Sequence, residues 1–132
     1  MFENFSYSPE QIKKYHQAAV KDLRLITREK APEMVFYVSY NVLIKAAMAV
    51  TAKNNLRVKS RVGHHIELIH KLAEILRNPE IEDAANRMRS KRNHDLYGGG
   101  VAISQKEAHF YLSFCKNLMK QVDSYLFPNK LL

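Results

Sequence analysis

Hydrophobic side chains recur every three or four residues over most of the chain, which is the spacing of an amphipathic helix. The first helix is predicted to begin at Ser8-Pro9-Glu10-Gln11, which offers an N-cap serine, a proline at the first helical position and a glutamine that completes a capping box. A second helix runs from about Pro32 to Lys53 and is apolar nearly all round, so we expect it at the centre of the fold. Its apolar stretch contains Asn41 and Lys45 and is shorter than the roughly 20 apolar residues of a membrane-spanning helix.

Two further helices follow a polar loop over residues 54–62. The third starts after Gly63, and Asn78-Pro79-Glu80 starts the fourth with an N-cap, a proline and an acidic first turn. We expect the fourth helix to end between Asn93 and Tyr97, ahead of a run of three glycines. Each of these helices carries one apolar face, which predicts that both pack against the core.

The fifth helix is predicted from the capping box Ser104-Gln105-Lys106-Glu107 up to Pro128, which stops it. The chain has no internal repeat and no linker long enough to separate two domains. We therefore expect an all-α fold, a single domain over residues 1–132 built as an up-down bundle of about five helices. A composition of 46% hydrophobic and 26% charged residues is typical of a soluble globular protein.

Cys115 is the only cysteine, which excludes an intrachain disulfide and a zinc–thiolate site. No grouping of histidines with carboxylates predicts a metal site, and we expect no cofactor. His64 and His65 lie at a helix start, and we interpret them as structural residues. The first residues lack the charged and apolar regions of a secretory signal, so we expect a cytoplasmic protein without membrane association.

The net charge of +8 favours a polyanionic partner if the positive charges gather in one place. One cluster lies in the polar loop, at Arg57, Lys59 and Arg61. The other opens the segment from Arg87 to Tyr97, where four basic residues fall within six positions. Like charges at this spacing repel one another, and a bound polyanion relieves the repulsion.

The segment from Arg87 to Tyr97 carries the side chains needed to bind a phosphodiester. Arginine binds phosphate oxygens through two parallel hydrogen bonds, and histidine exchanges a proton near neutral pH. The candidate binding residues of this segment are Arg87, Lys91, Arg92, Asn93, Asp95 and Tyr97, beside the candidate catalytic pair Arg89 and His94.

The spacing of the catalytic pair sets a geometric condition. Arg87, Lys91 and His94 form one stripe of a continuous helix, whereas Arg89 lies about 140° away from His94. Arg89 and His94 therefore converge only if the helix breaks near Asn93 or if two chains face each other. The plain alternative is a solvated basic helix end with a capping histidine, favoured by the helix dipole.

The order of these motifs resembles the HEPN family. Arg89 and His94 fit its R-x4-6-H signature, within the string RSKRNHDLYGGG. The segment from Phe36 to Asn41 is similar to the family's central helix, and the segment from Gly63 to Ile69 to the start of its next helix.

This resemblance implies a homodimer with both motif helices near its twofold axis and, in many members, metal-independent cleavage of RNA. His94 would then be the acid/base and Arg89 would stabilise the phosphate charge, while Asn93 and Tyr97 orient the site. It further implies a toxin partnered by a nucleotidyltransferase-like antitoxin protein.

Arg92-Asn93 with Tyr97 fits a second register equally well, one found in HEPN branches without a usable histidine. The alternative function is a non-catalytic HEPN module that binds a partner protein, a nucleotide or a nucleic acid backbone. A third is a generic basic helical domain that binds nucleic acid without a cleft or a dimer.

Overall fold

The structure, a computed structural model, describes residues 2–28, 31–59, 63–98 and 102–128, and for residues 94–98 it describes the backbone alone. These residues form five helices and two short strands, so the predicted all-α bundle is confirmed. The elements are β1 (Phe2–Asn4), α1 (Pro9–Thr27), α2 (Pro32–Lys53), β2 (Leu56–Val58), α3 (His64–Leu76), α4 (Pro79–Gly98) and α5 (Gln105–Leu126).

The two predicted capping boxes both form. The Ser8 hydroxyl accepts a hydrogen bond from the Gln11 backbone N–H at 3.2 Å, and the Ser104 hydroxyl accepts one from the Glu107 N–H at 3.0 Å. In each box the side chain of the third helical residue accepts a hydrogen bond from the backbone N–H of the cap residue. Such caps each stabilise a helix by about 1 kcal/mol, which explains why α1 and α5 start where the sequence predicts.

Helix α2 is the core helix of the bundle and packs against each of the other four helices. By length and composition it is apolar enough to cross a membrane, but 61% of its most apolar 18-residue segment is buried inside the protein. Its largest fully buried side chains include Phe36, Tyr40 and Leu43. The predicted central position of this helix is therefore confirmed.

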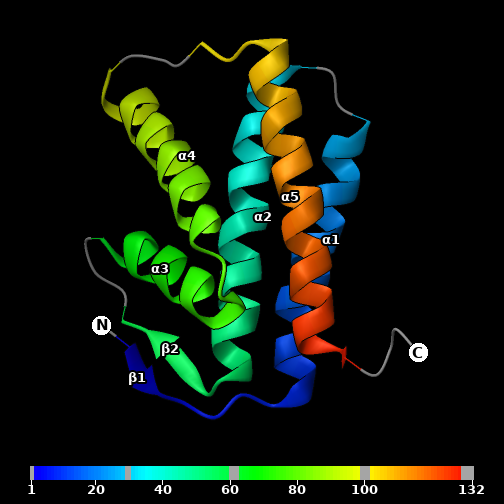
Figure 1. The fold of residues 1–132 in the computed structure, drawn as a ribbon, viewed down its shortest axis with the longest axis vertical. Helices are drawn as coiled ribbons and strands as arrows, with labels where there is room; N and C mark the ends of the chain where they lie inside the picture. The colour runs from blue at the N-terminus through cyan, green and yellow to red at the C-terminus, as the bar shows by residue number, and fades with distance from the viewer. Residues whose placement is uncertain (1, 29–30, 60–62, 99–101, 129–132) are drawn as a thin grey trace.

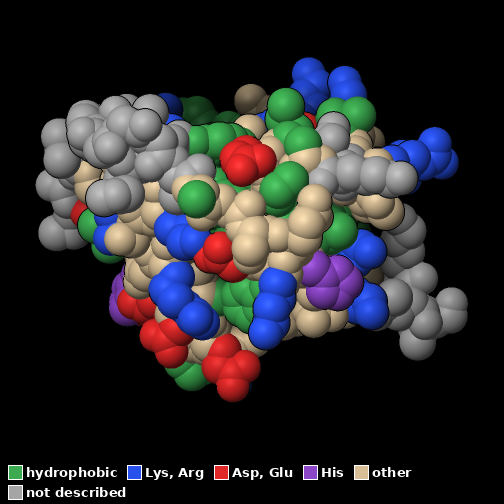
Figure 2. Space-filling model, turned by 90° about the horizontal axis from the view of Figure 1, so that it is seen from above, with side chains coloured by type: hydrophobic (Ala, Val, Ile, Leu, Met, Phe, Trp, Pro, Cys, Tyr) green, Lys and Arg blue, Asp and Glu red, His purple; other side chains and the backbone are tan. Residues whose placement is uncertain are grey.

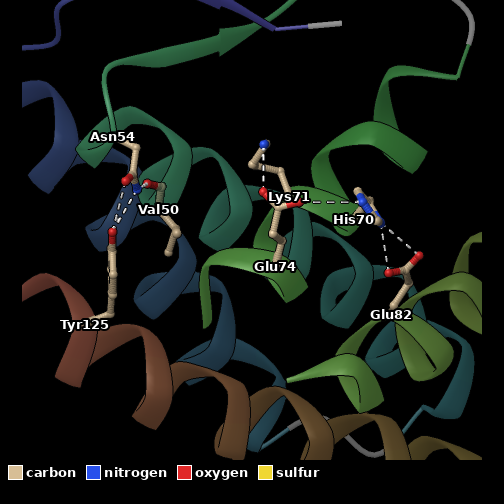
Figure 3. Close-up of polar contacts among 7 residues, drawn as sticks. All are labelled: Val50, Asn54, His70, Lys71, Glu74, Glu82 and Tyr125. Atoms are coloured by element: carbon tan, nitrogen blue, oxygen red, sulfur yellow. Dashed lines mark hydrogen bonds and ion pairs between the residues drawn. The ribbon is translucent and has the colours of Figure 1, made fainter. Parts of the chain in front are cut away.

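Helices α1, α2, α4 and α5 run up and down along the long axis, while α3 lies across it (Figure 1). Polar contacts connect α3 to α4 and the end of α2 to α5 (Figure 3). The His70 ring on α3 contacts Glu82 on α4 at 3.0 Å, and the Asn54 amide at the end of α2 donates to the Tyr125 hydroxyl on α5 at 2.9 Å. As a result α4 is held through α3 as well as by α2.

Two predicted boundaries are wrong. Within the expected loop, Leu56–Val58 forms β2, which pairs antiparallel with β1 and places Phe2 opposite Val58. Three-residue strands show too little alternation to be recognised, and this pairing joins distant parts of the chain. Helix α4 runs to Gly98 instead of ending between Asn93 and Tyr97, since the polar residues before the glycine keep the helical conformation.

Candidate functional site

The basic segment of α4 is divided between two faces of the helix. Arg87 and Lys91 face α5, where the Arg87 guanidinium carbon lies 5.7 Å from the centre of the Phe110 ring and the Lys91 ammonium pairs with Glu107. Arg87 and Phe110 also line a groove of about 480 Å³ between α4 and α5. Lys91 therefore already has a carboxylate partner within the chain, whereas Arg87 contacts an aromatic ring.

Arg89 and Arg92 face α2 and α3 instead. The Arg92 guanidinium carbon lies 5.2 Å from the centre of the Tyr40 ring, within the range of a cation–π contact. The Nε atom of Arg89 is buried and has no hydrogen-bond partner among the described residues. A buried donor without a partner costs about 1–3 kcal/mol, so a bound water or anion oxygen here would stabilise the protein.

Tyr40 and His65 form the second half of this cluster. The Tyr40 side chain is 1% exposed, and its hydroxyl lies 2.8 Å from Nδ1 of His65, in the first turn of α3. The rings of His64 and His65 are in edge-to-face contact, with their centres 4.5 Å apart. We call Tyr40, His65, Arg89 and Arg92 the arginine–histidine cluster.

The electrostatics of the arginine–histidine cluster keep its imidazole neutral. Burial, followed by electrostatic interaction with His64, Arg92 and Arg89, lowers the pKa of His65 from 6.5 to about 4. Burial also raises the pKa of Tyr40, although Arg92 and Arg89 oppose that shift. At neutral pH the cluster therefore contains two guanidinium charges, an uncharged imidazole and an uncharged phenol.

No carboxylate pairs with Arg89 or Arg92 in the part of the chain that the structure describes. Other basic side chains do have such partners: Lys45 pairs with Asp22 and Lys71 with Glu74. Two partly buried positive charges without a carboxylate partner among the described residues favour the binding of an anion, because the protein has already removed part of their water.

The structure does not meet the first of the two geometric conditions for the predicted pair of Arg89 and His94, a helix break near Asn93. Helix α4 is continuous through both residues, so no break near Asn93 brings them together. The side chains of His94, Asp95 and Tyr97 lie outside the described residues, and Asn93 is partly buried. A shared site for Arg89 and His94 therefore requires a second chain.

The predicted loop cluster lies elsewhere. Arg57 donates two hydrogen bonds to Glu3, at 2.9 and 2.6 Å, and its guanidinium lies 4.2 Å from the centre of the Phe5 ring. Lys59 is exposed, and Arg61 lies outside the described residues. Helix α3 lies between the small sheet, which includes Arg57, and α4, which includes Arg89 and Arg92 (Figure 1).

Among the described residues, charges of both signs are mixed on the face at the upper end of the bundle (Figure 2). Seen from above, Lys and Arg side chains alternate with acidic and hydrophobic ones (Figure 2). Within the described ranges, no group of three or more His, Cys, Asp or Glu side chains is placed to hold a metal ion. The two arginines of the arginine–histidine cluster, which have no carboxylate partner among the described residues, are therefore the feature that best indicates a ligand.

Sequence reasoning placed Arg89 and Arg92 in the site but missed Tyr40 and His65. Their hydrogen bond joins residues 25 positions apart on different helices, and no local pattern indicates it. The one available signal was a tyrosine within the most apolar helix, because a buried hydroxyl needs a partner. Comparisons of the chain with protein-family models, with curated proteins and with solved structures found no match.

Proposed function

We propose that the protein is a HEPN-like RNA-binding protein whose phosphate site is formed by Arg89 and Arg92. The observation that carries this proposal is the lack of any carboxylate partner for these two partly buried arginines in the described chain. RNA phosphates supply the missing charge, and two arginines three residues apart on one helix face can bind neighbouring oxygens. The resemblance of RSKRNHDLYGGG to HEPN motifs supports the same choice of ligand.

The chemistry that the resemblance implies is cleavage of the bound RNA without a metal. The 2′-hydroxyl oxygen attacks phosphorus, the bond from phosphorus to the 5′ oxygen breaks, and the proton lost by the nucleophile is balanced by one delivered to the leaving oxygen. His94 would move these protons while Arg89 stabilises the charge on phosphate. Because α4 is continuous, His94 would come from the other chain of a homodimer.

RNA binding is tested through its dependence on salt. Each phosphate contact on a single strand contributes about 0.7 to the log–log slope, so Arg89→Gln with Arg92→Gln should reduce the slope by about 1.4. Lys116→Gln with Lys120→Gln is the matched control, because it removes the same charge from exposed positions on α5. An equal reduction in both double variants would mean non-specific attraction and would contradict a phosphate site on α4.

Stability is checked separately, because Arg89 and Arg92 are partly buried. Circular dichroism should show folded protein for every variant that enters the comparison. Arg92→Lys is a milder second variant that keeps the charge and loses the planar fork. It should weaken binding with little change in slope, whereas unchanged affinity would show that Arg92 does not bind phosphate through its fork.

Cleavage is tested with single-stranded RNA in the presence of a chelator. The wild type should cut RNA and leave DNA intact, and His94→Ala should cut about 100-fold more slowly or worse. Wild-type protein that binds RNA without cutting it would favour the alternative, a non-catalytic HEPN module for a nucleic acid backbone, a nucleotide or a partner protein. The continuous course of α4 favours this alternative, since it separates Arg89 from His94 within one chain.

If the protein is the toxin of a toxin–antitoxin pair, as the resemblance implies, it has an antitoxin protein as its partner and acts in the cytoplasm. A nucleotidyltransferase-like antitoxin would act with the protein in the cytoplasm. Co-expression with the product of a neighbouring gene of that type should yield a stable complex, or relieve growth arrest in cells that make this protein. Growth arrest without any effect of such a neighbour would contradict the pairing.

A further inference from the structure

His65 is a histidine that the proposed cleavage does not use, yet it is the best-defined polar group of the arginine–histidine cluster. Its Nδ1 atom lies 2.8 Å from the buried Tyr40 hydroxyl, and the Arg92 guanidinium carbon lies 5.2 Å from the centre of that same tyrosine ring. A structural histidine at a helix start does not need two arginines beside it. Its surroundings therefore suggest a role with the ligand that these arginines bind.

The hydrogen bond from Tyr40 determines which nitrogen of His65 carries the proton. A buried O–H group needs an acceptor, and Nδ1 of His65, at 2.8 Å, is the acceptor that the described residues give to Tyr40. If Nδ1 carried the proton and donated it instead, the Tyr40 hydrogen would have no acceptor there. The satisfied arrangement therefore has the Tyr40 hydroxyl donating and the His65 proton on Nε2.

An imidazole in this form is a hydrogen-bond donor without a charge. Such a donor can stand beside two guanidinium groups, whereas a lysine there would be repelled by both. Neutral imidazole is a known means of polarising an oxygen in enzyme sites. It complements the arginines by adding a directed N–H to their positive charge.

We propose that His65 is the third donor of the phosphate site, binding a phosphate oxygen through Nε2–H, and that Tyr40 is the positioning residue that fixes this tautomer. The role rests on the proposed binding of RNA phosphate by Arg89 and Arg92. It assigns His65 to charge stabilisation and not to proton transfer. The lone pair of Nδ1 is occupied by Tyr40, and the low pKa leaves little imidazolium at neutral pH.

The tautomer is measured by nitrogen NMR of histidine-labelled protein, in which Nδ1 and Nε2 give distinct signals when protonated. Free wild-type protein should show the His65 proton on Nε2, and Tyr40→Phe should give a mixture of both forms. A wild-type proton on Nδ1 would overturn the proposal without any ligand present. Addition of short 2′-O-methylated single-stranded RNA, which cannot be cut, should shift the Nε2 signal of the wild type.

Binding of the same RNA then separates the donor from its neighbours. His65→Leu and Tyr40→Phe should each weaken binding about 10-fold, the scale of a lost hydrogen bond to a charged group. His65→Gln places an amide donor near the position of Nε2 and should recover most of that loss. His109→Gln is the matched control, because His109 is exposed on α5, and it should bind within about twofold of the wild type, since surface changes rarely exceed about 0.5 kcal/mol.

Two failures can be told apart. If the Arg89 and Arg92 variants lose affinity while His65→Leu binds as the wild type does, the donor role is wrong and the phosphate site stands. If wild-type protein does not bind RNA at all, the proposed function fails and the donor role fails with it. In that case the arginine variants have no affinity to lose, which identifies the cause.

Discussion

The neutral state of His65 makes the stability of the protein depend on pH. In the unfolded chain this imidazole titrates near 6.5, and in the folded protein burial and the nearby positive charges lower the pKa to about 4. Between pH 6.5 and pH 4 the imidazole of His65 is therefore protonated in the unfolded state and neutral in the folded state. His65 therefore leaves the free energy of unfolding unchanged above about pH 6.5. The free energy falls as the pH drops from 6.5 toward 4, and His65 lowers it no further below that pH.

The size of this effect follows from the shift in pKa. Each unit is worth 1.36 kcal/mol, so a drop from 6.5 to about 4 corresponds to about 3 kcal/mol at most. The ring is only partly buried, and screening by solvent reduces the value. We expect the wild type to lose about 2 kcal/mol through this group between pH 7 and pH 4.5.

His65→Gln isolates the effect, because it removes the titrating group and leaves every other histidine and carboxylate in place. Urea unfolding of both proteins between pH 7 and pH 4.5 should show a steeper loss for the wild type, whatever their difference at pH 7. Buffers without phosphate are needed, since an anion beside the arginines would raise the pKa of His65. Parallel curves for the two proteins would refute a neutral, desolvated His65.

Three further predictions concern the fold and its assembly. The Cys115 thiol is buried and donates a hydrogen bond to the Ser39 carbonyl, and burial raises its pKa to about 12. A thiol-reactive dye at pH 8 should therefore label Cys115 only after the protein has been unfolded in urea. Rapid labelling of the native protein would contradict this. Leu43→Ala should cost about 3–5 kcal/mol in chemical denaturation, whereas Leu25→Ala, at a side chain 61% exposed, should cost less than about 0.5. Light scattering should report the proposed homodimer at about 31 kDa, twice the chain mass of 15.3 kDa, and a monomer at every concentration would count against a site shared between chains.

The helices could be predicted because their signals are local. Ser8 and Ser104 each cap a helix within four residues, and Pro32 and Pro79 occupy first helical positions as expected. The small sheet could not be predicted, because Phe2–Asn4 finds its partner strand more than 50 residues away and neither strand is long enough to show alternation. Its formation depends on tertiary packing that no short window of sequence contains.

The candidate site was predictable in part for the same reason. A basic segment on α4 is visible in the sequence, but which of its members are free to bind a ligand depends on neighbours from other helices. Lys91 is paired with Glu107 and Arg57 with Glu3, so two of the predicted binding residues are engaged within the chain. His65 was interpreted as a structural residue because the arginines beside it come from another helix, more than 20 positions later.

The course of α4 also bears on the two motif registers that the sequence left open. On a continuous helix, the residues that share a face with Arg89 lie three and four positions away, which are Arg92 and Asn93. A single chain can therefore offer Arg89, Arg92 and Asn93 to one phosphate, whereas His94 lies about 140° around the helix from Arg89. The register of Arg92 and Asn93 suits binding by a monomer, and the register of Arg89 and His94 needs the dimer. RNA affinity that persists in a monomeric variant, with cleavage lost, would assign binding to the first register and chemistry to the second.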